Sequence, residues 1–141
     1  MIKITKIFRF EMAHAIFCYS GKCKNIHGHS YILHVTISAF GDADHFIDAP
    51  GFIFDFRQLK EIVNEKVIKK LDHQLVLSNE YLQTNSSLLL AENIFPWEME
   101  PSVENILIFI KQNLQPALPQ NITLAKLKLF ETADSYAEWE A

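Results

Sequence analysis

The sequence has little glycine, no excess of positive charge and no long apolar run, and each shortage excludes a class of protein. Lysine and arginine number 13 against 17 aspartates and glutamates, which leaves a net charge of -4. A chain of this charge is not expected to bind nucleic acid or an anionic membrane surface. No apolar run approaches the roughly 20 residues that a helix needs to cross a bilayer. With four glycines and no Gly/Ser-rich stretch, the chain shows no flexible linker between domains.

Cysteine is scarce as well. Cys18 and Cys23 are the only two, so the chain can form one disulfide at most. The first four residues alternate like a strand and lack the apolar block of a secretory signal peptide. Chains without a signal peptide usually keep their thiols reduced. We therefore expect a cytoplasmic protein with two free cysteines.

What the chain does contain is enough apolar material for a sizeable core. Hydrophobic residues make up 49% of its 141 residues, and eleven phenylalanines argue against disorder. The sequence shows neither an internal repeat nor a low-complexity tract. A single globular domain over 1–141 is therefore expected.

Alternating polarity predicts four strands. They cover about 2–14, 29–40, 121–131 and 135–139. In the first strand His14 extends an apolar row, which is where a buried ligand would sit. In the third strand Glu131 continues an apolar row in the same way.

Apolar residues at helical spacing predict two helices. Asp55 is the expected N-cap of the first, with Gln58 completing a capping box, and this helix runs to about Leu71. The second begins near Ser102 and is ended by Pro116. The stretches 15–28, 41–44 and 74–100 are expected to be a loop, a turn and a long loop.

The resulting order of elements is ββααββ. Two consecutive helices between two pairs of strands favour an α+β fold. We expect an antiparallel four-stranded sheet with both helices on one of its faces.

Three histidines form the most informative pattern. His27 and His29 are two residues apart on an extended segment and so point to the same side, while Gly28 between them allows close approach. His14 on the preceding strand supplies a third imidazole. Three histidines leave the fourth tetrahedral position of a zinc ion open for water or substrate. The alternative is that each is an ordinary core or surface histidine.

Cys23 stands between Lys22 and Lys24, and neighbouring positive charge favours the reactive thiolate. It is a candidate general base or nucleophile beside the metal. Two alternatives remain open at this point. Cys23 can be an unremarkable loop cysteine, or it can join Cys18 and two histidines in a closed structural zinc site.

Two further groups carry candidate chemistry. Asp72 precedes His73, and an aspartate can orient an imidazole or take part in a proton relay. The alternative for this pair is a histidine that interacts with a helix C-terminus. Glu131 needs a donor partner, and a ring edge with two adjacent N–H groups would suit it. Its alternative is simple exposure at the end of the strand.

Six short motifs run through the chain in a fixed order. They are 10–14 (FEMAH), 23–31 (CKNIHGHSY), 54–56 (FDF), 71–73 (LDH), 101–105 (PSVEN) and 131–132 (ET). Together they resemble the motifs of the 6-pyruvoyl-tetrahydropterin synthase superfamily. The resemblance extends over nearly the whole chain, and six ordered motifs are far more specific than any one of them.

This resemblance implies a fold, a cofactor and roles for the candidate residues. It implies the tunnelling fold, in which ββααββ subunits join their sheets into a barrel within a homo-oligomer, commonly a hexamer with active sites between subunits. It implies Zn²⁺ as the cofactor and assigns roles as follows: His14, His27 and His29 as metal ligands; Cys23, Asp72 and His73 as catalytic residues; and Glu131, Ser102 and Glu104 as substrate-binding residues, with Glu131 anchoring the pterin ring.

The spacing within the second motif indicates a branch of the superfamily. Three residues separate Cys23 from His27, which resembles the bacterial 6-carboxy-5,6,7,8-tetrahydropterin synthases of queuosine biosynthesis. The implied reaction converts 7,8-dihydroneopterin triphosphate to the 6-carboxy pterin, acetaldehyde and triphosphate. A pyruvoyl-forming or dihydroneopterin-cleaving relative is the alternative enzyme, and a non-catalytic zinc- or pterin-binding module is the alternative from another class. Ala15 stands where the superfamily often has a basic residue, so one substrate contact is expected to be missing.

Overall fold

The computed structural model of this chain describes residues 1–39 and 45–141, and the turn expected at 41–44 lies outside them. The strands are β1 (Lys3–His14), β2 (His27–Ala39), β3 (Gln74–Ser78), β4 (Ile94–Trp97), β5 (Ile122–Phe130) and β6 (Tyr136–Glu140). The helices are α1 (Phe56–Val63), α2 (Lys69–Leu71), α3 (Asn79–Thr84) and α4 (Val103–Leu114). Shorter helical segments are η1 (Lys22–Lys24), the π-helical η2 (Asn64–Ile68), η3 (Ser86–Leu90) and η4 (Gln115–Ala117).

The strands of the described residues form one six-stranded sheet in the order β4-β3-β1-β2-β5-β6. β1 pairs antiparallel with β2, β2 with β5 and β5 with β6, whereas β3 is parallel to both β1 and β4. The α+β class expected from the sequence is therefore correct. The expected antiparallel four-stranded sheet is wrong, because two parallel strands extend it beyond β1.

The long loop expected over 74–100 is also wrong, since this segment folds into β3, α3, η3 and β4. The strands escaped detection for physical reasons. In β3 the last three residues, Val76 to Ser78, are all buried, so the strand shows no alternation of polarity. β4 contains Pro96, which is tolerated there because β4 is the edge strand.

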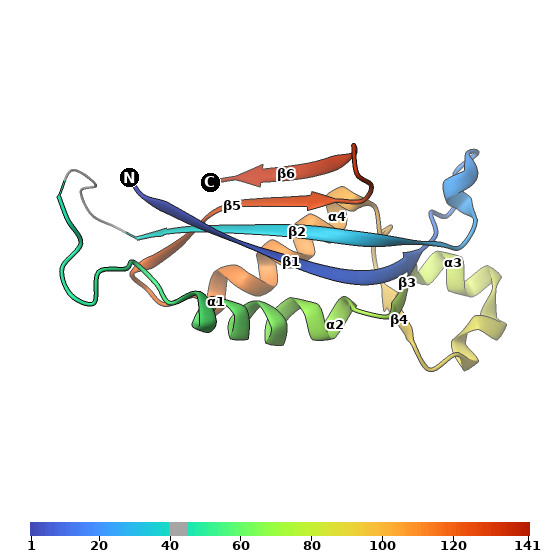
Figure 1. Ribbon diagram of the computed structural model, residues 1–141. Helices are drawn as coiled ribbons and strands as arrows, with labels where there is room; N and C mark the ends of the chain where they lie inside the picture. The colour runs from blue at the N-terminus through green and yellow to red at the C-terminus, as the bar shows by residue number, and fades with distance from the viewer. Residues whose placement is uncertain (40–44) are drawn as a thin grey trace.

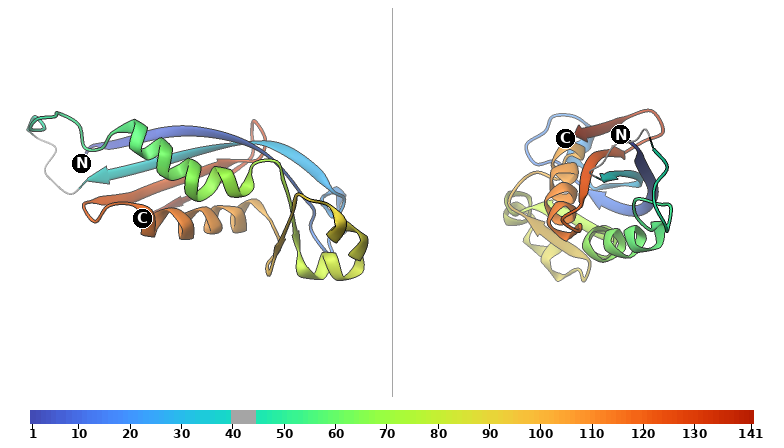
Figure 2. Two further views of the ribbon diagram at one scale, coloured as in Figure 1. Left: turned by 90° about the horizontal axis from the view of Figure 1, so that it is seen from below. Right: turned by 90° about the vertical axis from the view of Figure 1, so that its left-hand side faces the viewer.

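Two long helical segments cover one face of the sheet, and the other face carries no helix (Figure 1). The first runs through α1, η2 and α2, and α4 lies beside it (Figure 2). The buried side chains of these helices pack against the inward rows of β1, β2 and β5 in a single core. The expectation that both helices lie on one face is correct, and α3 is an addition at the far end of the sheet.

Side-chain caps define where the two main helices begin. Asp55 caps α1 by accepting the Arg57 N–H at 2.7 Å, rather than through a capping box with Gln58. Ser102 caps α4 by accepting the Asn105 N–H at 3.3 Å. Each cap satisfies an N–H group that the first turn of a helix leaves unpaired. No helix in the described ranges is both long and apolar enough to span a membrane.

Candidate functional site

The three candidate metal ligands meet on the helix-covered face of the sheet. His14 ends β1 and lies directly opposite His27, the first residue of β2, in the antiparallel ladder. His29 is two residues further along β2 and so projects from the same face. One nitrogen of each ring lies within 4.8 Å of those of the others. Strand pairing thus brings together side chains that are 13 to 15 residues apart in the sequence.

Hydrogen bonds determine which nitrogens are free to bind a metal. The Nδ1 of His14 lies 2.6 Å from the Pro101 carbonyl, and the Nδ1 of His27 lies 2.7 Å from the Asn25 carbonyl. Since a carbonyl only accepts, both Nδ1 atoms carry the hydrogen and, in the neutral rings, both Nε2 atoms present lone pairs. These two Nε2 atoms are 3.0 Å apart. Two facing lone pairs at this distance repel each other unless a proton or a metal ion lies between them.

Burial favours the neutral form of His14 and His29, which metal binding requires. Desolvation lowers the pKa of His14, against the opposing effects of the Pro101 carbonyl and Glu131. Desolvation also lowers the pKa of His29. The Nε2 of His29 is buried and has no hydrogen-bond partner within the described part of the chain. An unpartnered buried nitrogen beside two converging lone pairs fits a tetrahedral zinc ion with three histidine ligands.

Glu131 lies beside this cluster, just beyond the end of β5. Its Oε1 is 3.7 Å from His29 Nε2, and its Oε2 is 3.9 Å from His14 Nε2. Its side chain is 23% exposed, so one side of the carboxylate remains open to a ligand. The sequence placed Glu131 on an apolar row, and the structure brings it to the histidines.

Of the two candidates in the PSVEN motif, only Ser102 is next to a residue that contacts the cluster. Ser102 caps α4 and follows Pro101, whose carbonyl holds His14. Glu104 is exposed on α4 and lines a different hollow, between α4 and β6, together with Trp139. The structure therefore does not bring Glu104 to the histidines within this chain.

Cys23 lies in η1 of the loop that joins β1 to β2 and is exposed. Its carbonyl accepts the Ile16 N–H at 2.8 Å, which folds the loop back towards the end of β1. Cys18 is exposed in the same loop with a φ of 54°. Among the described residues, the group able to hold a metal contains neither cysteine. The geometry therefore favours the open three-histidine site over the closed site that uses Cys18.

Asp72 and His73 form a side-chain pair, with His73 Nδ1 3.0 Å from Asp72 Oδ2. The backbone of Glu11 holds both residues. Its N–H donates to Asp72 Oδ1 at 2.9 Å, and its carbonyl accepts the His73 N–H at 2.6 Å. His73 has a φ of 61°, a strained conformation for a non-glycine residue of the kind that gathers at functional sites.

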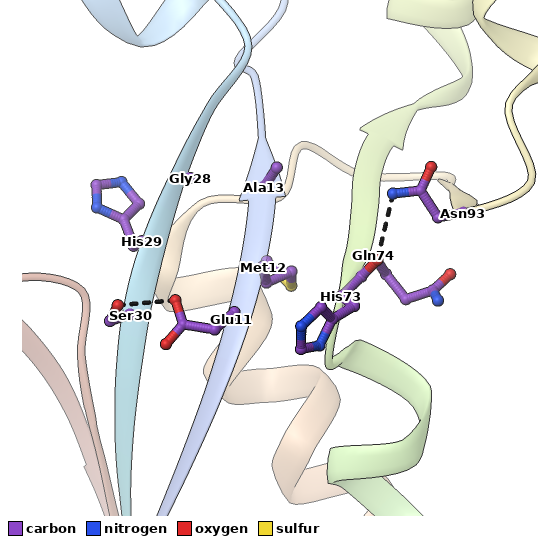
Figure 3. Close-up of a pocket in the computed structure, with 9 residues that line it drawn as sticks. All are labelled: Glu11, Met12, Ala13, Gly28, His29, Ser30, His73, Gln74 and Asn93. Carbon is purple, nitrogen blue, oxygen red and sulfur yellow. Dashed lines mark hydrogen bonds between the residues drawn. The ribbon is translucent and has the colours of Figure 1, made fainter.

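His73 borders a cavity of about 310 Å³, shown in Figure 3. Glu11 and Ser30 also line it and are joined by a 2.7 Å hydrogen bond from the serine hydroxyl. Both residues lie on the helix-free face, since they alternate with Met12 and His29 along their strands. Figure 3 shows His29 on β2 and His73 just before β3, with β1 between them. His29 borders this cavity too, but among the described residues the group able to hold a metal contains neither Asp72 nor His73.

Sequence reasoning missed three contributors to these sites: Glu11, Tyr31 and the Pro101 carbonyl. Tyr31 carried a signal, because its hydroxyl sits at the end of a row that is otherwise apolar apart from His29. The other two act through backbone atoms, whose partners lie 61 and 87 residues away in the sequence. The departure at Ala15 has a structural basis. Its side chain is fully buried against Leu77 and Leu82, so a basic residue would not fit there.

Known proteins share both the sequence and the fold of this chain. The family described as 6-pyruvoyl tetrahydropterin synthase matches residues 3–141. The 6-carboxy-5,6,7,8-tetrahydropterin synthase of Haemophilus influenzae is 33% identical over 144 residues, covering 99% of each protein, and that of Rickettsia typhi is 30% identical over 142 residues, covering 98% of this chain and 99% of its own. The structure of Caenorhabditis elegans 6-pyruvoyl tetrahydropterin synthase superposes with a TM-score of 0.71 at 20% identity, covering 99% of this chain and 95% of that one. The chain therefore belongs to the 6-pyruvoyl tetrahydropterin synthase family.

Proposed function

We propose that this protein is a zinc-dependent 6-carboxy-5,6,7,8-tetrahydropterin synthase, which converts 7,8-dihydroneopterin triphosphate to the 6-carboxy pterin with release of acetaldehyde and triphosphate. The observation that carries the proposal is the convergence of His14 and His27, whose Nε2 lone pairs face each other beside the unpartnered Nε2 of His29. Relatives with this activity in their names match nearly the full length of the chain.

In this proposal His14, His27 and His29 hold the zinc ion, which as a Lewis acid would stabilise negative charge that develops on the oxygens of the pterin side chain. Glu131 accepts two adjacent N–H groups of the pterin ring, because a carboxylate and an amidine-like edge match in a bidentate way. This contact places the reacting carbons beside the histidines. Ser102 positions the loop that carries the Pro101 carbonyl, and with it the ring of His14.

The acid–base chemistry falls to Cys23, Asp72 and His73. The Cys23 thiolate takes a proton from the pterin side chain, and the imidazole of His73 returns a proton to the rearranging chain. Asp72 keeps the ring of His73 oriented through the 3.0 Å contact at Nδ1. These steps require the Asp72–His73 pair to lie beside Cys23 and the histidine cluster.

Assembly into a homo-oligomer would bring the Asp72–His73 pair of one subunit to the histidine cluster of another. The histidine cluster lies on the helix-covered face, whereas the backbone of Glu11 holds the Asp72–His73 pair, and His73 borders the cavity that Glu11 and Ser30 line. We infer that the pair of one subunit completes the histidine site of the next, as in the hexamers that the family resemblance implies. The exposed position of Glu104 fits a substrate contact made in the same way, across the subunit boundary.

The test is to incubate the purified, zinc-loaded protein with 7,8-dihydroneopterin triphosphate and to identify the products by mass spectrometry. A 6-carboxy pterin with acetaldehyde supports the proposal. Triphosphate release without acetaldehyde assigns the pyruvoyl-forming reaction instead. Intact substrate, with zinc still bound, contradicts both reactions and points to a non-catalytic binding module.

A further inference from the structure

Tyr31 carries a hydroxyl at the point where the apolar row of β2 meets the histidines. It follows His29 by two residues on β2 and therefore projects from the same face of the sheet. Its side chain is fully buried. The ring is stacked on Phe10 with 5.0 Å between centroids, and its edge meets the ring of His29 at 5.6 Å. Packing on both sides fixes the ring, and with it the position of the hydroxyl.

The hydroxyl donates to Oε2 of Glu131 at 3.5 Å. A phenol is protonated at neutral pH and an ionised carboxylate can only accept, so the Tyr31 hydroxyl is the donor in this contact. A buried tyrosine hydroxyl usually has a hydrogen-bond partner. Here the partner is the candidate pterin anchor.

Glu131 also lies within reach of the metal ligands. Its two oxygens are 3.7 Å from His29 Nε2 and 3.9 Å from His14 Nε2. A cation held by the histidines would attract this carboxylate, since carboxylate oxygen is an ordinary zinc ligand. A carboxylate in the fourth position would close the site to substrate and would no longer face the pterin ring.

We propose that Tyr31 is a positioning residue, whose hydroxyl holds the Glu131 carboxylate off the metal and directs it to the substrate. The proposal rests on the function proposed above. It adds that the Tyr31 hydroxyl determines whether Glu131 binds the substrate or the metal. The rigid, buried ring supplies the fixed point, and the partly exposed carboxylate is the movable partner.

The test is Tyr31→Phe, which removes the hydroxyl and keeps the stacked ring. We expect KM for 7,8-dihydroneopterin triphosphate to rise about tenfold, the size of effect typical for a hydrogen bond to a charged group, with kcat within about twofold. In the absence of substrate, we expect the dissociation constant for Zn²⁺ to fall about threefold or more, because the released carboxylate can bind the metal. Competition with a chromophoric chelator measures this constant. Weaker substrate binding together with tighter zinc binding would identify a positioning role. A general loss of structure at the site would weaken the binding of both substrate and zinc.

Two further variants complete the design. Tyr136→Phe is the matched control, since Tyr136 is half-exposed on β6 and packs against Phe130 outside the site, and neither affinity should change. In a Glu131→Gln background, adding Tyr31→Phe should no longer tighten zinc binding, because the neutral amide is a poor ligand.

The zinc measurement keeps this proposal separate from the proposed reaction. If the wild-type protein converts no pterin, the reaction fails, but tighter zinc binding by Tyr31→Phe still supports the positioning role. Equal or weaker zinc binding by Tyr31→Phe overturns the role, whatever the activity of the wild-type protein.

Discussion

His14 Nε2 and His27 Nε2 lie 3.0 Å apart, while the Nδ1 of each ring is held by a backbone carbonyl. The carbonyls of Pro101 and Asn25 therefore select the tautomer that turns both lone pairs inwards. Outer partners of this kind orient metal-binding histidines and raise their basicity. The backbone has in this way prepared the site for a cation.

The facing lone pairs predict that His27 is needed for metal binding. We expect His27→Ala to weaken zinc binding by more than about 100-fold, the upper range for loss of an outer partner alone. The secondary structure should persist, because His27 is only partly buried at the start of β2. Chelator competition and circular dichroism measure these effects. His34→Ala, on the opposite face of β2, is the control and should bind zinc normally; equal affinities in the two variants would remove His27 from the site.

The position of the two cysteines predicts different outcomes for their removal. Cys23→Ala should retain zinc and fold while losing turnover by about 100-fold or more, as expected for a lost general base. Cys18→Ala should retain both zinc and turnover, because Cys18 is outside the metal-capable group. Metal analysis and product assays check both variants. Loss of zinc from Cys18→Ala would instead support the closed site.

Glu131 is expected to bind substrate rather than hold the metal. Glu131→Ala should raise KM for the pterin by about tenfold to 100-fold, since a bidentate charged contact is lost, and should leave zinc stoichiometry unchanged. Steady-state kinetics and metal analysis provide the measurements. Lys128 and Glu138 face the helix-free side, so Glu138→Ala serves as the acidic control. An unchanged KM in Glu131→Ala would exclude this residue from the pterin site.

The proposal that a neighbouring subunit completes each site predicts complementation between inactive variants. Cys23→Ala and His73→Ala should each be inactive alone. Co-expressed in equal amounts, they should recover about a quarter of the wild-type activity, because random pairing of subunits in a closed oligomer restores one site in four. Purified mixed oligomers give the measurement. Mixtures that remain inactive would show that the cysteine and the histidine act within one subunit.

The burial of the histidine cluster predicts how the stability of the zinc-free protein depends on pH. Burial lowers the pKa of His14 and His29 in the folded state, so below about pH 6.5, the ordinary histidine pKa, the unfolded chain binds more protons than the folded one. Stability is then complete above this pH and is lost as the pH falls towards the lowered values. Urea midpoints of the zinc-free protein should therefore be lower at pH 6 than at pH 8. His14→Asn should reduce this difference between the urea midpoints at pH 6 and pH 8. If the difference is unchanged, groups other than His14 cause the pH dependence.

Much of the histidine site was predictable because its geometry is local. Side chains alternate along a strand, so the positions of His27 and His29 alone place both rings on one face. His14 extends the apolar row of its own strand for the same reason. The two main helices and their caps at Asp55 and Ser102 were likewise readable, since capping and helical spacing involve neighbouring residues.

Other features arose only from contacts between distant parts of the chain. β3 and β4 are strands because they pair with β1 and with each other, not because their short sequences alternate. The Asp72–His73 pair is held by Glu11, 61 residues away from Asp72, and this contact fixes the pair beside β1. The sequence by itself determined which residues are candidates for the chemistry and on which side of their strands the histidines lie. Only the tertiary structure decided that Tyr31 meets Glu131 and that Glu11 holds Asp72, since these contacts join residues far apart in the sequence and leave no periodic pattern in it.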